Sequence, residues 1–279
     1  MLIIVCECLY LKQKYKMAEK RNLLLSTDTL WGCGLDLIFD AAVEAWFDGI
    51  DLAIWKNFDA WNVSYVKKLV RKHDMPVKVI QTSPNLNKKE IDKALDLCEA
   101  LNIDTININA PKFFDYKAYS FIKDNLDSYK KANPDITFSI INPKDSRFFA
   151  MPIPKYRFSN IVEIIKKYGC NLWLEVSNID EDVFEDELLR KISSFAPYIS
   201  TIYLSDKNKA WKSRIMPGDW ILKLPTFLKK VKMNKYSRYF SIRFDIWKAD
   251  LVDADKVQLL LKKTVDYFDE HYTDVDVND

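Results

Sequence analysis

Short apolar runs alternate with longer amphipathic stretches along most of the chain. Eight runs have the length and apolar character of buried strands, and each precedes a segment with apolar residues at helical spacing. The predicted strands are 22–28, 50–55, 77–81, 104–109, 137–142, 171–176, 200–205 and 239–245. The predicted helices are 35–47, 62–73, 88–101, 115–132, 158–168, 181–195, 220–233 and 253–271. Eight strand–helix units that recur about every 30 residues are typical of a closed (β/α)8 TIM barrel.

Capping residues support several of these boundaries. Gly49 follows the first predicted helix as a C-terminal cap, and Asn87 precedes helix 88–101 as an N-cap, with Glu90 placed as in a capping box. The turn after the first strand, Trp31–Gly34, is WGCG rather than the GxGxxG of a dinucleotide-binding open sheet. No linker-like segment divides the chain, so we expect a single α/β domain.

The two ends of the chain lie outside the repeating pattern. Residues 1–16 contain an apolar run interrupted by Glu7, without the basic region and cleavage site of a signal peptide, and shorter than the roughly 20 apolar residues that cross a bilayer. We interpret 1–16 as an N-terminal extension upstream of the true start at Met17, or as a strand at the barrel floor, and expect it to be dispensable. The barrel is predicted to span 17–272, and an acidic tail 273–279.

Composition and charge limit the class of protein, the kinds of site and the partners that can be expected. The 279 residues include 48% hydrophobic and 29% charged residues with a net charge of +2, as in a globular protein with a large core. Five cysteines without a CxxC pair suggest free thiols in a reducing compartment, so we expect a cytoplasmic protein with no membrane association. Only two histidines occur, which excludes a site built from a histidine cluster. Residues 220–244 carry basic but no acidic side chains, which we interpret as a solvated helix surface in preference to a phosphate or nucleic-acid patch, so we expect no nucleic-acid partner.

Polar residues end most of the predicted strands, where the active sites of TIM barrels lie. These residues are Asp28, Asp51, Gln81, Asn109, Asn142, Glu175, Asn178, Asp206, Arg243 and Asp245. Ser241, Arg243 and Asp245 share one face of the last strand by its period of two, so both charged groups are expected to point inward. A mouth of carboxylates and amides suits a polar, hydroxylated ligand.

Several phrases occur in an order that resembles a known family. They are LLLSTDTL, FDGIDLAI, MPVKVIQTSP, LNIDTININAP, LEVSNID, IYLSDKN and MPGDW. In this order, over roughly residues 22–270, the chain resembles the xylose isomerase-like TIM barrels, the superfamily of sugar phosphate isomerases and epimerases and of endonuclease IV. The resemblance implies an isomerase- or epimerase-like barrel that acts on or binds a small polyhydroxylated ligand.

The chain departs from that family at its metal ligands. Members usually hold divalent metals with a glutamate ending the fifth strand, Asp-x-x-His at the sixth, histidine at the seventh and glutamate at the eighth. The corresponding residues here are Asn142, Glu175 with Asn178, Tyr203 and Asp245 or Arg243, while Asn109 replaces a fourth-strand histidine and Asp206 is retained. The resemblance therefore implies a degenerate metal site.

Two interpretations of the carboxylates remain open. Glu175, Asp206 and Asp245 can together hold Mg²⁺ or Mn²⁺ with water and amide oxygens, whereas zinc prefers imidazole and thiolate ligands. Alternatively, the two aspartates pair with Arg243 and Lys207, and the pocket is polar and free of metal.

The resemblance also suggests roles for individual residues. The predicted catalytic residues are Glu175, as a base or ligand, and Arg243, as an electrophilic or phosphate-binding group. The predicted substrate-binding residues are Asp28, Trp55, Gln81, Asn109, Asn142, Asn178 and Trp211, where the tryptophans either stack on a sugar ring or pack in the core. The alternatives are a non-catalytic ligand-binding barrel that has lost its metal ligands, and a structural role.

Overall fold

A computed structural model describes residues 21–109, 116–142, 147–148, 151–152, 165, 169–208, 213–219 and 221–276. The predicted 1–16 extension, most of the predicted helix 158–168, Trp211 and the last three residues of the tail lie outside these ranges, and the domain boundaries stay predictions. Among the described residues, no helix is both long and apolar enough to cross a membrane.

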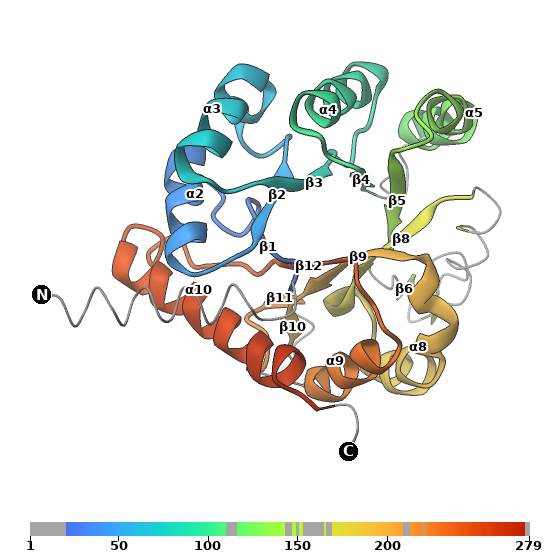
Figure 1. The fold of residues 1–279 in the computed structure, drawn as a ribbon. Coiled ribbons are helices and arrows are strands. Elements are labelled where there is room, and N and C mark those ends of the chain that lie inside the picture. Colours follow the sequence, from blue (N-terminus) through green and yellow to red (C-terminus); the bar gives the residue numbers. More distant parts are fainter. Residues whose placement is uncertain are drawn as a thin grey trace, which may run out of the picture.

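Eight parallel strands close into a barrel, with helices around the outside (Figure 1). The strands are β1 (Leu23–Ser26), β2 (Gly49–Ala53), β3 (Val77–Gln81), β4 (Thr105–Ile108), β5 (Thr137–Ile141), β8 (Asn171–Glu175), β9 (Ile199–Leu204) and β12 (Tyr239–Ile242). Each strand pairs with the next one in this order, and the register Leu24↔Ser241 closes β12 on β1. The predicted (β/α)8 fold is confirmed.

The outer helices begin and end close to their predicted positions. They are α2 (Leu35–Glu44), α3 (Val63–His73), α4 (Lys88–Leu101), α5 (Tyr116–Ala132), α7 (Glu181–Val183), α8 (Leu189–Phe195), α9 (Leu224–Met233) and α10 (Ala254–Phe268). A π-helical segment, η4 (Phe184–Leu188), joins α7 to α8, and another, η6 (Asp269–Thr273), continues α10. Helix α9 starts four residues later than predicted, with Pro225 in its first turn, where a missing N–H costs nothing.

Short elements occupy the connections between strands and helices. They are the 3-10 turns η1 (Phe58–Trp61), η3 (Val176–Asn178) and η5 (Ala196–Tyr198), and the two-stranded pairs β6 (Arg147–Phe148) with β7 (Met151–Pro152) and β10 (Asp206–Lys207) with β11 (Ser213–Ile215). The β10–β11 hairpin follows β9, so it belongs to the loops at the carboxyl ends of the strands, where the candidate site lies.

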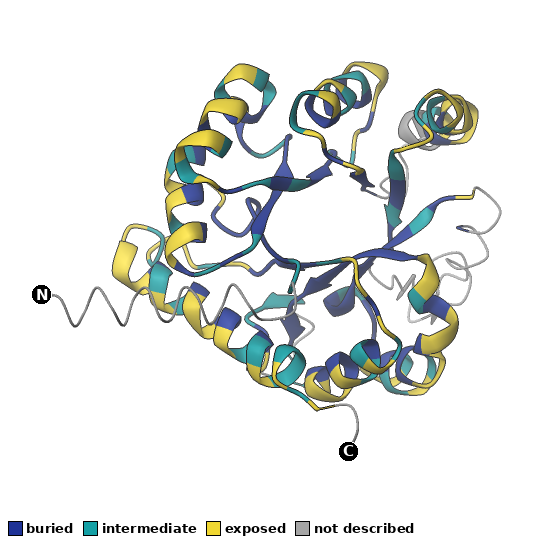
Figure 2. Cartoon of the chain, in the orientation of Figure 1, coloured by how far each residue is buried: buried dark blue, intermediate teal, exposed yellow. Residues whose placement is uncertain are grey.

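The two faces of the barrel wall differ in chemistry. Leu25, Ile106 and Phe240 belong to the large apolar core between strands and helices, and the helices are exposed mainly on their outward faces (Figure 2). The alternate positions of the strands point into the barrel, and several of them are polar yet fully buried, including Asp51 and Gln81. A polar barrel interior requires hydrogen-bonded partners, because an unpaired buried polar group costs free energy.

The structure contradicts the expected Gly49 cap and one half of the expected capping box, and it confirms the Asn87 N-cap. Gly49 begins strand β2 and does not cap helix α2, which ends at Glu44; a Cβ at Gly49 would lie 2.9 Å from the carbonyl oxygen of Pro76. Asn87 caps α4 as predicted, since its side chain accepts the Glu90 N–H at 3.2 Å. The Glu90 carboxylate does not return to Asn87 but accepts the hydroxyl of Ser83 at 2.6 Å, which holds the β3–α4 loop.

Candidate functional site

A buried ion-pair group lies at the carboxyl ends of the strands; we call Asp28, Glu175 and Arg243 the mouth cluster. Arg243 follows β12 directly and donates from Nη2 and Nε to Asp28 Oδ2 at 2.8 and 2.9 Å. Its Nη1 lies 3.4 Å from Glu175 Oε2. The side chains of Asp28 and Glu175 are each 1% exposed. One guanidinium therefore joins the ends of β1, β8 and β12.

Asp28 is surrounded by three cations. Besides Arg243, Arg214 Nη2 lies 3.0 Å from Oδ2 and Lys56 Nζ lies 3.3 Å from Oδ1. Burial by itself would raise the pKa of Asp28, but the charges of Arg243, Arg214 and Lys56 outweigh it and hold this pKa at about 2. Asp28 is thus a permanent anion within the mouth.

Glu175 is in a different electrostatic environment. Burial raises its pKa, and the nearby charge of Arg243 opposes that rise. Its Oε1 accepts hydroxyl groups from Ser205 at 2.7 Å and Ser177 at 3.0 Å. A buried carboxyl group with a raised pKa beside a fixed cation is suited to holding and moving a proton.

Two aromatic rings lie against Arg243 inside the barrel. Its guanidinium carbon is 5.6 Å from the ring centroid of Trp173 and 5.4 Å from that of Tyr203, within cation–π range. The two rings meet edge to face with centroids 4.7 Å apart. Tyr203 also donates its hydroxyl to Asp51.

Below this layer the barrel interior holds further polar contacts. Asp51 also accepts the hydroxyl of Ser241 at 2.7 Å, and burial raises the pKa of Asp51 to about 6. Gln81 donates to Ser26 Oγ at 2.8 Å. Asp51 lies in the middle of β2 and not at its end, so the expectation that it belongs to the strand-end residues is wrong; its hydrogen bonds place it in the interior network.

The predicted amide residues bond to backbone groups of neighbouring strand ends. Asn142 donates to the carbonyl of Glu175 at 3.0 Å and accepts its N–H at 2.7 Å. Asn178 donates to the carbonyl of Asn142 at 2.9 Å, and Asn109 donates to the carbonyl of Thr82. Asn142 therefore holds the backbone that carries Glu175.

The three predicted metal ligands have separate partners. Asp206 Oδ1 accepts the backbone N–H groups of Lys207 at 2.7 Å and Leu222 at 3.1 Å. Asp245 lies beyond the end of β12, with a side chain 52% exposed and 3.2 Å from Arg214. The expectation that Asp245 points inward beside Arg243 is therefore wrong, because β12 ends at Ile242 and its alternation stops there.

The charge of the mouth cluster disfavours a divalent metal. Arg243 is a permanent cation in contact with Glu175 and Asp28, the two carboxylates of the mouth cluster. Within the described part of the chain, Glu175, Asp206 and Asp245 do not bring their oxygens within 4.8 Å of one another. The described residues of the mouth thus do not fit the divalent metal that the sequence resemblance implies.

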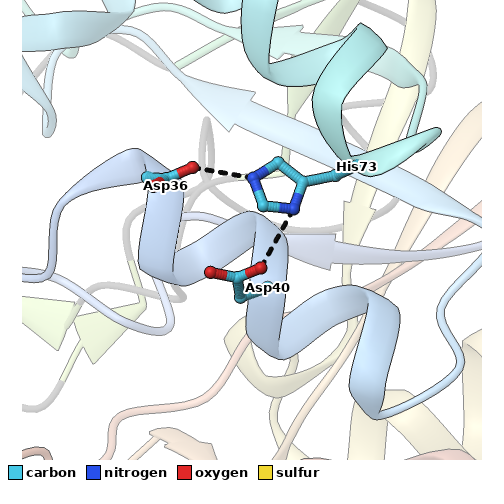
Figure 3. A group of neighbouring side chains, drawn as sticks. All are labelled: Asp36, Asp40 and His73. Carbon is cyan, nitrogen blue, oxygen red and sulfur yellow. Dashed lines mark hydrogen bonds and ion pairs between the residues drawn. The ribbon is translucent and has the colours of Figure 1, made fainter.

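A second charged group lies on the outside of the barrel; we call Asp36, Asp40 and His73 the outer cluster. Asp36 and Asp40 lie on α2, and the His73 ring on α3 points between them (Figure 3). His73 Nε2 is 2.7 Å from Asp36 and Nδ1 is 3.0 Å from Asp40. One atom from each residue lies within 4.8 Å of the others, so the group can be considered for a metal ion. Its position on outer helices separates it from the mouth.

Two residues of the site, Lys56 and Arg214, were not predicted. Lys56 follows the predicted ligand residue Trp55, and its Nζ lies 4.3 Å from that ring's centroid. Arg214 lies in the β10–β11 hairpin, and no periodic pattern marks it. Both residues are distant from Asp28 in the sequence, and only the folded chain brings their side chains into contact with it.

Comparisons with known proteins agree with this geometry at the level of fold. No protein-family model and no curated protein sequence matches the chain. The IolI protein, solved with a bound zinc atom, has a TM-score of 0.68 and 14% identity over 90% of this chain and 99% of its own. The 3-keto-D-glucoside 4-epimerase YcjR from E. coli has a TM-score of 0.64 and 13% identity, covering 87% and 99%. A D-allulose 3-epimerase from Methylomonas sp., in complex with D-allulose, has a TM-score of 0.62 and 11% identity, covering 90% and 97%.

Proposed function

We propose that this barrel binds a small polyhydroxylated, sugar-like ligand at the carboxyl ends of its strands and acts on it as an isomerase or epimerase without a divalent metal. The observation that carries the proposal is the buried mouth cluster, in which Arg243 lies between Asp28 and Glu175. Sugar epimerases among the structures of the same fold support the ligand class.

Each residue of the mouth cluster has a distinct role in this proposal. Glu175, whose pKa is raised by burial, takes a proton from a carbon next to a carbonyl group, whose oxygen receives the negative charge, and returns the proton to carbon. Arg243 stabilises the negative charge that develops on the neighbouring oxygen, the task that a metal performs in metal-dependent enzymes. The 3.4 Å contact between Arg243 and Glu175 is the longest of Arg243's three hydrogen bonds in the cluster, so it is the one that a ligand oxygen would most easily replace.

The geometry also gives some support to a non-catalytic barrel. Both ends of the Asn142 amide are occupied by the backbone of Glu175, and Glu175 itself accepts three side-chain donors. A ligand would then be held by the mouth with no proton transferred. Binding and chemistry must therefore be measured separately.

The test measures exchange of carbon-bound protons with solvent. A panel of ketoses and aldoses is incubated with the protein in D2O with excess EDTA, and deuterium at carbon is followed by NMR. We expect EDTA-resistant exchange in the wild-type protein and none in Glu175→Gln. Sugar binding without exchange supports the non-catalytic alternative.

The predicted Mg²⁺ or Mn²⁺ site is tested in the same preparation. Stabilisation by Mn²⁺ that Glu175→Gln abolishes would overturn the metal-free proposal and support the ligand set Glu175, Asp206 and Asp245. Absence of both sugar binding and exchange across the panel would overturn the proposed function itself.

A further inference from the structure

The rim of the mouth contains hydrogen-bond donors that lack acceptors. Among the described residues, the buried Nε and Nη2 atoms of Arg214 and the buried Nε1 of Trp55 have no hydrogen-bond partner. Arg214 Nη2 is close to two carboxylates, but its N–H groups are not directed at them. Unpaired buried donors cost free energy, and these three atoms would all be satisfied by an acceptor-rich group.

The backbone at Arg214 combines a bulge with a left-handed conformation. Strand pairing in the hairpin joins Asp206 to Ile215 and Lys207 to Ser213, which makes Arg214 the extra residue of a bulge. Its φ of 63° lies in the left-handed region, uncommon for arginine, and its carbonyl accepts the Asp245 N–H at 2.8 Å. Bulges often redirect a side chain next to a binding site, and backbone strain of this kind is concentrated at such sites.

Lys56 contacts the other carboxylate oxygen of Asp28 and lies beside two aromatic rings. Its Nζ lies 4.3 Å from the Trp55 centroid and 4.7 Å from the Trp31 centroid. Lys248 Nζ lies 5.6 Å from the Trp31 centroid and adds a further positive charge. Lys56, Arg214 and Arg243 all contact the carboxylate of Asp28, while Arg214 also contacts Asp245 and Arg243 also contacts Glu175.

We propose that Lys56, Arg214 and the indole N–H of Trp55 form an anion subsite at the rim of the mouth, which binds a carboxylate or phosphate group of the sugar-like ligand. The inference rests on the proposed function and narrows its substrate class to acidic sugars. The anion accepts hydrogen bonds from Arg214 and Trp55, and Lys56 contributes its charge. The hydroxylated part of the ligand then extends toward Arg243 and Glu175.

The test compares matched probes by calorimetry at low and high salt. The probes are glucose, glucuronate, glucose 6-phosphate and inorganic phosphate, so the carboxylate and phosphate sources are separated. We expect at least one acidic sugar to bind about tenfold or more tightly than glucose, because hydrogen bonds to charged groups are the strong ones. That preference should decrease as salt increases, since the subsite is partly exposed.

Three variants make the test specific. Lys56→Gln and Arg214→Gln should each reduce the preference for the acidic sugar, and the first keeps the proposal testable if the hairpin variant does not fold. Lys229→Gln, an exposed lysine on α9, is the matched control and should keep the preference. Retention of the full preference in both rim variants would overturn the subsite.

Other outcomes distinguish the subsite from the proposed function. Equal affinity for glucose and both acidic sugars would overturn the subsite and leave the proposed function in place. Binding of inorganic phosphate that depends on Arg214, with no binding or exchange of any sugar of the panel, would support the anion-binding subsite and overturn the proposed function. Binding of none of the probes would overturn the subsite, and absence of binding and exchange across the sugar panel as well would overturn the proposed function.

Discussion

The mouth cluster and the outer cluster share one arrangement: a nitrogen cation or potential cation between two carboxylates. In the mouth cluster, the side chains of Arg243, Asp28 and Glu175 are 8%, 1% and 1% exposed. In the outer cluster, the His73 side chain is 5% exposed, but the carboxylates of Asp36 and Asp40 are 43% and 59% exposed. The two groups therefore differ mainly in whether their carboxylates have lost water.

That difference decides what each cluster can do. When one member of a buried ion pair is removed, its partner is left as an uncompensated charge in the protein interior, which solvates that charge poorly. The loss of stability is therefore large. Exposed carboxylates keep their water and lose little when a partner is removed. The mouth cluster can therefore form a preorganised charged site, whereas the outer cluster joins α2 to α3 on the surface, where Lys72 also contacts Asp36 at 2.7 Å.

Removing the cation of the mouth cluster should have the largest effect. We expect Arg243→Met to lower the free energy of unfolding by about 3–5 kcal/mol, because Asp28 and Glu175 would remain buried without it. Urea denaturation at neutral pH measures the loss, and Arg243→Lys, which keeps the charge, should lose less. A loss below about 1 kcal/mol for Arg243→Met would show that the pairs are effectively solvated.

Asp51 provides a buried carboxylate for comparison, because no Lys or Arg in the described part of the chain lies within 4.0 Å of it. Burial raises its pKa to about 6, above the value of about 3.8 in an unfolded chain. The folded protein therefore favours the protonated form of Asp51. The stability that this form contributes is fully present below about pH 4 and is lost as the pH rises through 6. Between pH 4 and pH 8, the wild-type protein should lose about 2–3 kcal/mol relative to Asp51→Asn. Denaturation of both proteins across this range measures the difference, and parallel pH profiles would contradict the prediction.

Disrupting the outer cluster should have the smallest effect. His73→Gln should shift the urea midpoint less than either interior variant, because its carboxylate partners are exposed, and added salt should reduce the shift further. The two ring nitrogens face different carboxylates, so we expect no large stabilisation by Zn²⁺. A Zn²⁺-dependent increase in the midpoint that His73→Gln removes would instead identify the outer cluster as a metal site.

The alternation of strands and helices was predictable because it depends on local periodicity. An apolar run and an amphipathic stretch each bury a face determined by the geometry of the chain itself, so α4 (Lys88–Leu101) has its predicted bounds. The active sites of TIM barrels lie at the carboxyl ends of the strands, and this rule placed Asp28, Glu175 and Arg243 among the candidates. Gly49 was misassigned because a glycine after a helix fits both a cap and a closely packed strand start.

Contacts between distant strand ends were decided only by the tertiary structure. Arg243 and Asp28 are separated by 215 positions, and they meet because β12 closes on β1. The end of β12 at Ile242 directs Arg243 inward and leaves Asp245 outside, while a bulge directs Arg214 toward Asp28. The sequence by itself determined the eight repeating units and the polar strand ends, since both follow from nearest-neighbour geometry. Which charges pair was determined by barrel closure and strand register, because the Coulomb energy and desolvation of a side chain depend on distances through space and on burial.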